Sequence, residues 1–475
     1  MEANTNPTTV NDTVDKDYIT NLPPELTKSI FGYLSAVDLI RVASHNKHLR
    51  NVANTDLIWR PLCQEKGWER YGSITDLTKE IPYKPKDVIV KHDSTMDLVA
   101  TCRWKEIYIK AYLLENNWKK MCFHVSSLKP SNMDAGLYPR PSVRDVVIDK
   151  DCLVVVMSNE TIQIWDVKTD TCLHIIPAIS EGVACLRVCN GKLAVGSKDG
   201  VVRLFSANSG ELLHLMQGTK EESIDRILFI DTELVISDAI PLNITGDGAK
   251  HKHINVWNVE DGALRHSFKI DVEGAILRDV DYRDNMVVGA YSDKCLRLWD
   301  AVTGDCIHTL RYNSEGIAER LSCCLGSSII ALADIDDMKL IIWNKKSGEN
   351  VTSVSISGDF EGSPSKCEAV EDLLVMCLAE TYFLVYDKTG KLLKTVYDEE
   401  GLRSICCYGD KFIDQLRADC TDDCVDICRI FRVVSGSMNE MGAIVGELID
   451  MIEGVDDTKM VVSSADSVLD IYHFW

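Results

Sequence analysis

A repeated aromatic residue constrains the fold of this 475-residue chain more than any other feature. From Met286 to Arg311, short apolar runs alternate with turn-forming residues, which predicts two consecutive β-hairpins. The aromatic residue that ends the middle run of this unit recurs at intervals of 40 to 52 residues. Its eight positions are Trp165, Phe205, Trp257, Trp299, Trp343, Tyr386, Phe431 and Tyr472. A period of this length predicts a β-propeller.

Each repeat has room for four short antiparallel strands, which form one blade. A four-stranded sheet cannot bury both faces alone, so neighbouring sheets must stack around an axis and close into a ring. The recurring aromatics are therefore predicted to be core residues between blades. Eight repeats predict an all-β propeller of eight blades. Only three residues follow Tyr472, so we expect Met121–Leu128 to supply the outermost strand of the last blade.

The repeat resembles the WD repeat. The pairs Trp165-Asp166, Trp257-Asn258, Trp299-Asp300 and Trp343-Asn344 keep the Trp-Asp signature of that family or a near variant. The resemblance extends from Trp118 to Trp475. The Gly-His dipeptide usual between WD repeats is absent from the sequence. We therefore expect the His–Asp hydrogen-bond network of the family to be missing, and strand pairing and aromatic packing to hold the blades.

The N-terminal part has a different pattern. Residues 1–17 are polar and are predicted to be a disordered tail. Leu26, Ile30 and Leu34 then recur at intervals of four, which places them on one helical face. Pro23 and Pro24 suit a helix start, and Asp38 is expected to cap a second helix. Further apolar groups follow in the same helical spacing up to Cys63.

This helical segment resembles the F-box in the order and spacing of its residues. The matching residues are Leu22-Pro23-x-Glu25-Leu26, Ile30-Phe31-x-Tyr33-Leu34, Asp38-Leu39, Trp59 and Cys63. About fifty residues cannot hide so many large apolar side chains internally, so a partner surface is expected to cover some of them. The resemblance implies binding to the Skp adaptor and, through it, to cullin. The residues predicted to contact the adaptor are Leu22, Pro23, Leu26, Ile30, Leu34, Leu39, Trp59 and Leu62. An ordinary helical cap on the propeller is the alternative.

These patterns predict four parts: the tail at 1–17, an F-box at 18–68, a linker with a helix at 69–118, and the propeller at 119–475. The linker helix is indicated by apolar residues from Trp104 to Trp118 at helical spacing. F-box proteins with WD repeats carry a similar W-K-x-x-Y…N-W segment, which Trp104-Lys105, Tyr108 and Asn117-Trp118 match. Such a helix is expected to act as a stiff spacer.

Composition narrows the functional classes. The net charge of −22 opposes nucleic-acid binding, which needs clustered Lys and Arg. No apolar run approaches the ~18 residues that a membrane span requires. Eighteen cysteines without a visible secretory segment indicate reduced thiols, so we expect a cytoplasmic and/or nuclear protein that binds neither nucleic acid nor membrane.

The sequence contains no recognisable catalytic or cofactor-binding motif. No nucleophile is paired with a base, and no Gly-rich phosphate loop follows a strand. Cys420, Cys424 and Cys428 are spaced by four, but they fall across a predicted hairpin without a histidine, so hairpin and core thiols are favoured over a zinc site. The large loop 238–253 is a predicted contact surface, and its histidines are expected to be solvated. We expect no cofactor, no metal and no enzymatic activity.

Arginines recur near the predicted start of the innermost strand of several blades. Arg144, Arg320 and Arg403 lie nine residues before the second strand, and Arg226 and Arg278 lie eight residues before it. Like charges that converge on one narrow opening are costly unless an anion neutralises them, and Arg binds phosphate or carboxylate through two hydrogen bonds. The residues predicted to bind substrate are Arg144, Lys198, Arg226, Arg278, Tyr291, Arg320 and Arg403. Scattered, solvated arginines are the alternative.

The combination of modules resembles the F-box/WD-repeat substrate receptors of Skp–cullin–F-box (SCF) ubiquitin ligases. The resemblance implies that the F-box binds the Skp adaptor while the propeller captures a protein substrate. Members of this family that read phosphorylated degrons use arginines in the same strand register. We therefore expect a phosphorylated or acidic peptide at the channel mouth. A WD-repeat scaffold outside ubiquitination and a propeller enzyme are the other readings.

Overall fold

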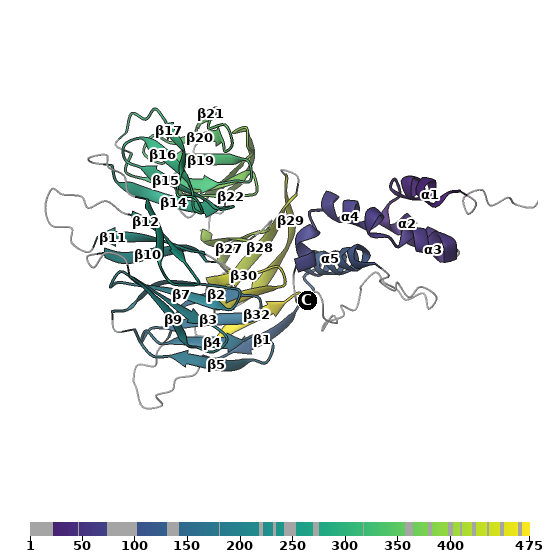
Figure 1. Cartoon of the computed structure of the whole chain (residues 1–475), viewed down its shortest axis with the longest axis horizontal. Helices are drawn as coiled ribbons and strands as arrows, with labels where there is room; N and C mark the ends of the chain where they lie inside the picture. Colours follow the sequence, from purple (N-terminus) through teal and green to yellow (C-terminus); the bar gives the residue numbers. More distant parts are fainter. Residues whose placement is uncertain are drawn as a thin grey trace, which may run out of the picture. The chain divides into compact units, whose positions relative to one another are not determined.

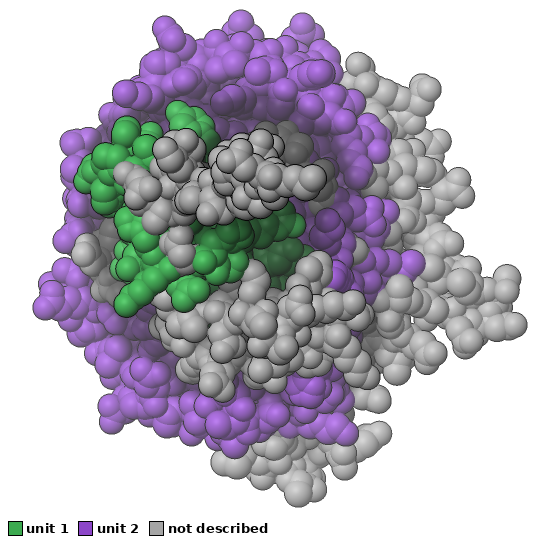
Figure 2. All heavy atoms as spheres, turned by 90° about the vertical axis from the view of Figure 1, so that its right-hand side faces the viewer, with its two compact units in different colours: residues 1–116 green, residues 117–475 purple. Residues whose placement is uncertain are grey.

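The computed structural model contains two compact units, residues 1–116 and residues 117–475, which are traced in Figure 1 and coloured separately in Figure 2. The structure describes residues 22–45, 47–73, 102–130, 142–179, 181–217, 222–230, 234–241, 253–268, 275–316, 318–356, 364–378, 382–397, 402–408, 411–419, 424–434, 437–446, 451–463 and 468–475. The predicted tail at 1–17 and most of the predicted linker, residues 74–101, lie outside this set.

The first unit is helical. Its elements are α1 (Pro24–Phe31), α2 (Ala36–His45), α3 (Lys47–Ala53), α4 (Asp56–Glu65), the 3-10 turn η1 (Glu69–Ser73) and α5 (Arg103–Lys119), whose last residues belong to the second unit. Pro24 occupies the first position of α1, where its missing N–H costs nothing.

The second helix begins one turn earlier than its predicted cap. The hydroxyl of Ser35 accepts the backbone N–H of Asp38 at 3.2 Å and donates to the Asp38 carboxylate at 2.6 Å. Ser35 is therefore the N-cap, and the carboxylate of Asp38, three residues later, accepts the hydrogen bond of its hydroxyl. The expectation that Asp38 itself caps the helix was wrong.

The second unit consists of eight four-stranded antiparallel sheets. Blade 1 contains β2 (Val143–Asp149), β3 (Cys152–Met157), β4 (Ile162–Asp166) and β5 (Thr171–Ile176). Blade 2 contains β6 (Val183–Cys189), β7 (Lys192–Ser197), β8 (Val201–Ser206) and β9 (Leu212–Gln217). Blade 3 contains β10 (Glu222–Ile230), β11 (Leu234–Pro241), β12 (His253–Asn258) and β13 (Leu264–Phe268). Blade 4 contains β14 (Leu277–Arg283), β15 (Met286–Tyr291), β16 (Cys295–Asp300) and β17 (Cys306–Arg311).

The other four blades have the same strand order. Blade 5 contains β18 (Leu321–Leu325), β19 (Ile329–Asp334), β20 (Lys339–Asn344) and β21 (Asn350–Ser355). Blade 6 contains β22 (Pro364–Val370), β23 (Leu373–Leu378), β24 (Tyr382–Tyr386) and β25 (Leu392–Tyr397). Blade 7 contains β26 (Leu402–Tyr408), β27 (Lys411–Asp419), β28 (Cys424–Val434) and β29 (Ser437–Gly446). Blade 8 contains β30 (Met451–Val455), β31 (Lys459–Ser463), β32 (Leu469–His473) and β1 (His124–Leu128).

The eight blades form a closed ring. The first strand of each blade contacts the first strands of both neighbours, including β2 of blade 1 with β30 of blade 8. The ring closes through β1, which pairs antiparallel with β32 in the register His124↔His473 to Leu128↔Leu469. The predictions of eight blades and of an outermost strand supplied from Met121–Leu128 are confirmed.

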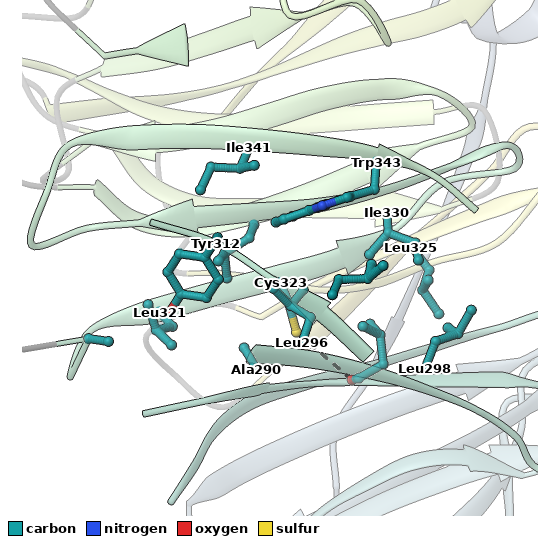
Figure 3. Close-up of a cluster of buried hydrophobic side chains, with 14 residues drawn as sticks. Ala290, Leu296, Leu298, Tyr312, Leu321, Cys323, Leu325, Ile330, Ile341 and Trp343 are labelled. Carbon is teal, nitrogen blue, oxygen red and sulfur yellow. Dashed lines mark hydrogen bonds between the residues drawn. The ribbon is translucent and has the colours of Figure 1, made fainter. Parts of the chain in front are cut away.

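The recurring aromatics lie in the core, as predicted. Seven of the eight are buried, and Tyr472 is half-buried against Phe123 at 5.0 Å between ring centroids. Figure 3 shows one seam, in which Leu296 and Leu298 of blade 4 face Leu321, Ile330 and Trp343 of blade 5. Apolar burial between blades at ~25 cal/mol per Å2 is the main stabilising term of such a ring.

Two sequence features fall partly outside the described residues. Of the expected loop at 238–253, residues 242–252 are not described, and the first and last residues continue β11 and begin β12. Cys420 is also outside, whereas Cys424 and Cys428 lie on β28 and Cys428 is buried. Within the described ranges, no group of three His, Cys, Asp or Glu side chains is arranged to hold a metal ion.

Candidate functional site

The first unit exposes large apolar side chains on its N-terminal helices. Tyr33 is 90% exposed and Leu57 75%, while Leu26 and Ile30 lie four residues apart on α1 at 54% and 46%. Val37 at the start of α2 is exposed as well. A small module that leaves this much apolar surface in water is suited to bind another protein.

The residues predicted to contact the adaptor separate into three groups by burial. Pro23, Leu26 and Ile30 are exposed, and Leu22, Leu34 and Leu62 are half-buried. Leu39 and Trp59, by contrast, are fully buried. The sequence spacing identifies the helical faces, but it does not separate the residues that face water from those that face the core of the unit.

Trp59 is the centre of that core. Its indole Nε1 donates to the carbonyl oxygen of Ala53 at 2.7 Å, and its ring meets Tyr108 of α5 edge-on at 5.2 Å. The ammonium group of Lys105 lies 5.5 Å from the same ring and hydrogen-bonds Asn54. Burial lowers the pKa of Lys105. Trp59 therefore packs α4 against α5, and its fully buried side chain adds nothing to the exposed apolar surface of the unit.

On the propeller, β-bulges decide which arginines are equivalent. The first strands of blades 1, 4 and 7 each bulge by one residue, and the extra residue is Arg144, Arg278 or Arg403. In β10 the bulge falls at Asp225, one residue before Arg226. Three of the five predicted arginines thus share one register position at the start of a first strand.

Arg320 lies at a different position. It precedes β18, which has no bulge, and its carbonyl oxygen accepts the N–H of Ile335 at 3.0 Å. The equivalent carbonyls of blades 1 and 4 belong to Ser142 and Ile276. Arg320 still lies at the end of the ring where the first strands begin, which we call the rim.

The rim arginines have carboxylate partners. Arg144 donates to Glu160 at 2.5 Å and to the carbonyl oxygen of Val183 at 2.8 Å, and the other oxygen of Glu160 accepts the N–H of Val183. The pair therefore clamps the start of β6 in the next blade. Arg320 is paired in a similar way with Asp336 at 2.9 Å.

Arg278 is the most available of the three arginines whose side chains are described. Its nearest carboxylate, Glu319, is 4.0 Å away and largely exposed, and its buried Nε has no hydrogen-bond partner in the structure. A guanidinium that lacks a close carboxylate partner can accept an incoming anion at its outer nitrogens. The side chains of Arg226 and Arg403 lie outside the described part of the structure.

The two other residues predicted at the rim differ in exposure. Lys198 is exposed in the turn before β8. Tyr291 is 2% exposed, its ring lies under the guanidinium of Arg297 at 4.9 Å, and its hydroxyl has no partner. Burial raises the pKa of Tyr291, so the phenol stays neutral. Tyr291 supports the rim from below the surface.

Sequence reasoning missed the carboxylates of the rim. Arg144 and Glu160, like Arg320 and Asp336, are separated by 16 residues, which is the distance across the first hairpin of a blade. Two further pairs lie four residues apart across a tight turn: Asp199 with Arg203, and Asp293 with Arg297. These two spacings are the signal that would have found them.

Comparison with known proteins supports the module assignment. Residues 19–65 match the F-box-like family model. The chain carries an F-box-like segment. It shares 22% identity over 35% of its length, and 32% of the relative, with the "Probable E3 ubiquitin ligase complex SCF subunit scon-2" of Neurospora crassa. The combination of an F-box-like segment with WD-repeat-like blades is that of F-box/WD-repeat proteins.

Other relatives cover different shares of the chain. "Cell division control protein 4" of Candida albicans is 24% identical over 72% of the chain and 51% of its own length. "Autophagy-related protein 16" of Arabidopsis thaliana is 25% identical over 35% of the chain and 30% of its own length. The chain thus spans between 30% and 51% of the three relatives described here.

One solved structure supports the fold alone. The computationally designed Ika8 protein aligns with 70% of this chain and 96% of its own, with a TM-score of 0.51 and 16% identity. Within the described residues, no helix has both the length and the apolar character that crossing a membrane would require.

Proposed function

We propose that this protein is the substrate-recognition subunit of an SCF-type ubiquitin ligase. The first unit binds the Skp adaptor, and through it cullin, while the propeller binds a phosphorylated or acidic segment of the target protein. The chain itself carries out no chemistry. Its contribution to rate is proximity, because a captured substrate presents its lysines at high effective concentration to a ubiquitin-conjugating enzyme.

The observation that carries the proposal is the apolar face of the F-box-like segment. Leu26 and Ile30 project from α1 into water, with Tyr33 directly after the helix. Burying such side chains in a partner groove yields ~1.5–3 kcal/mol each, which is the scale of a protein-binding hot spot. Leu39 and Trp59 support this face from the core.

The rim of the propeller is the proposed substrate site. The carboxylate of Glu319 lies 4.0 Å from the guanidinium of Arg278, so an acidic or phosphorylated side chain can pair with Arg278 without breaking a strong existing contact. Arg144 would first have to release Glu160 and Val183. We therefore rank Arg278, with the exposed Lys198, ahead of Arg144.

The rim lies at the end of the first strands opposite to the end near Trp118. Trp118, at the end of α5, donates its indole N–H to Asp457, which follows the first strand of blade 8. The rim arginines lie at the opposite ends of the first strands.

Capture from cells with the full chain as bait, with the proteasome inhibited, tests the proposal. Leu26→Ala combined with Ile30→Ala is expected to lose the Skp adaptor and cullin while retaining substrate. Arg278→Ala is expected to lose substrate while retaining the adaptor. Arg265, an exposed arginine at a bulge of the outermost strand of blade 3, provides the matched control Arg265→Ala.

The alternative reading makes a different prediction in the same experiment. A WD-repeat scaffold would capture protein partners through the propeller, and neither the wild type nor any variant would bring down the Skp adaptor. If Arg278→Ala still captures substrate while the wild type brings down the Skp adaptor, the receptor role stands and the substrate site lies elsewhere on the propeller.

A further inference from the structure

Two buried thiols meet across the seam between blades 5 and 6. Cys324 lies on β18 and Cys367 on β22, the first strands of these blades, and their sulfur atoms are 3.6 Å apart. Both side chains are buried, and both belong to the apolar cluster that fills this seam. The pair is independent of the rim and of the F-box-like face.

The surrounding contacts hold the two sulfurs together. The backbone N–H of Cys367 donates to the hydroxyl of Ser322 at 3.0 Å, which fixes β22 against β18 two residues from Cys324. Neighbouring Cys323 points to the other side, where its thiol lies 3.9 Å from the carbonyl oxygen of Val288 in blade 4. Alternation along β18 therefore directs one thiol at each neighbouring blade, and the Cys324 thiol meets that of Cys367.

We propose that Cys324 and Cys367 form a redox-sensitive staple, in which a hydroperoxide converts the two thiols into a disulfide that locks blade 5 to blade 6. One sulfur attacks the peroxide oxygen, which breaks the O–O bond and gives a sulfenic acid and an alcohol or water. The second sulfur then displaces the sulfenic oxygen as water and completes the S–S bond. Overall, two thiols lose two hydrogen atoms and two electrons, and the hydroperoxide accepts them.

The environment sets when this reaction occurs. The hydrogen bond with Cys367, followed by burial, raises the pKa of Cys324 well above that of a free thiol. Because the thiolate is the reactive form, the closed seam resists oxidation and the reaction waits for the seam to open. Once formed, the disulfide restricts the opening of the seam, and so it also protects itself from reduction.

A disulfide suits this site better than a bound soft metal ion. The lining of the seam is apolar, with Leu340, Ile342 and Leu384 in the same cluster. Two thiols become a neutral disulfide, whereas two thiolates that hold a monovalent soft metal ion carry a net charge of −1, which is costly to bury in an apolar seam. Among the described side chains no third His, Cys, Asp or Glu completes a metal-binding group there.

The test uses the full chain exposed to hydrogen peroxide under native conditions, followed by alkylation of free thiols and peptide mapping. The expected product is one linked pair containing Cys324 and Cys367, lighter by two hydrogen atoms than the reduced peptides. Amide exchange in β18 and β22 is expected to slow by about tenfold or more in the oxidised protein.

Cys324→Ser and, as a second variant, Cys367→Ala are expected to abolish both the linked peptide and the slowed exchange. Cys306→Ser, which removes an exposed thiol, is expected to leave both unchanged. The proposal is overturned if Cys324 and Cys367 are still alkylated as free thiols after Cys306 is fully oxidised, or if either is linked only to another cysteine.

Discussion

The four seams that join blades 1 to 5 in order and the seam that closes the ring are built in different ways. In the outermost strands of blades 1 to 4 a histidine packs against a glycine in the third turn of the next blade. The pairs are His174 with Gly210, His214 with Gly262, His266 with Gly304 and His308 with Gly348. In three of the four, the Nε2 atom lies 2.7–3.2 Å from a backbone carbonyl oxygen in the same turn.

These imidazole–carbonyl hydrogen bonds join neighbouring blades. A carbonyl oxygen only accepts, so the imidazole must carry its proton on Nε2. In the outermost strand of blade 5 a threonine, Thr352, occupies the position of these histidines and lies against Gly390 of blade 6. The histidine seams therefore repeat with the period of the chain, and each uses residues of two adjacent blades.

The closing seam uses residues that occur once. The ring of Trp118 stacks on Phe474 at 3.6 Å, and its indole N–H donates to the carbonyl oxygen of Asp457. The buried ammonium group of Lys411 lies 5.2 Å from the same ring and 3.4 Å from the Asp457 carboxylate. Asn117 donates to the carbonyl oxygen of Phe474 at 2.7 Å.

Together these contacts tie both ends of the second unit to blades 7 and 8. A repeat can encode a seam between neighbours, but a seam that joins the two ends of an array requires residues outside the repeat. The comparison predicts that the closing seam is the more costly to break, because its contacts are both buried and unique.

The largest effect is expected for Trp118→Ala. Removing this buried ring leaves a cavity and takes the aromatic face away from the buried Lys411. We expect the propeller to lose about 3–5 kcal/mol of unfolding free energy. Chemical denaturation of the full chain, followed by far-ultraviolet circular dichroism, measures it.

Tyr112→Ala is the control, since this side chain is exposed on the same helix. It is expected to change stability by less than about 0.5 kcal/mol. Equal effects of the two substitutions would mean that the closing seam does not hold the ring.

An intermediate effect is expected at a histidine seam. Gly304 has a φ of +83°, and a Cβ there would lie 2.6 Å from Nδ1 of His266. Gly182 has a similar φ of +80°, but its Cβ would meet only Glu160 at an ordinary 3.8 Å. Both Gly→Ala changes carry the backbone penalty of about 1–2 kcal/mol, and Gly304→Ala should lose a further ~1–3 kcal/mol from crowding.

The difference between the two alanine variants isolates the contact with the histidine. Thermal unfolding of both full-length variants measures it, and His266→Ala in the Gly304→Ala background should recover part of the loss. Identical unfolding curves for the two alanine variants would show that the histidine seams contribute nothing.

The smallest effect is expected from a turn that lies outside both kinds of seam. Burial alone would raise the pKa of Asp199, but hydrogen bonds from Arg203, Ser197 and the Val201 N–H outweigh it and lower the pKa. A depressed pKa stabilises the fold above the unfolded value near pH 4 and loses that stabilisation as pH falls through the folded value.

Asp199→Asn should therefore cost up to about 1 kcal/mol at pH 7, and the difference from wild type should shrink below about pH 4. Unfolding midpoints across this pH range measure the effect, with Asp305→Asn as an exposed control. A difference that stays constant with pH would contradict the assigned role of the carboxylate.

The features that follow from the regular spacing of the repeats were predictable from the sequence. The eight blades, the buried aromatics and the role of β1 follow from the spacing of the repeats and from the alternating segment that precedes the first of them. The F-box-like segment was recognisable because its residues are local in sequence. These are properties of single elements or of their repetition.

Features that depend on which side of an element faces a neighbour were not predictable. Trp59 and Leu26 belong to the same motif, yet one is buried and the other exposed, because α5 covers only one face of the helices before it. The rim arginines were located, but their carboxylate partners lie across a hairpin, and the bulges that shift Arg226 out of register leave no mark in the spacing.

Titration of the purified Skp adaptor into the full chain measures whether the exposed apolar face of α1 binds the adaptor. The account predicts a one-to-one complex that Leu26→Ala with Ile30→Ala weakens by at least about a hundredfold, since each side chain contributes ~1.5–3 kcal/mol at an interface. Leu215→Ala, a similarly exposed leucine on β9 of the propeller, should leave the affinity unchanged. Absence of binding by the wild type, or equal binding by the double variant, would contradict the assignment of this face to the adaptor.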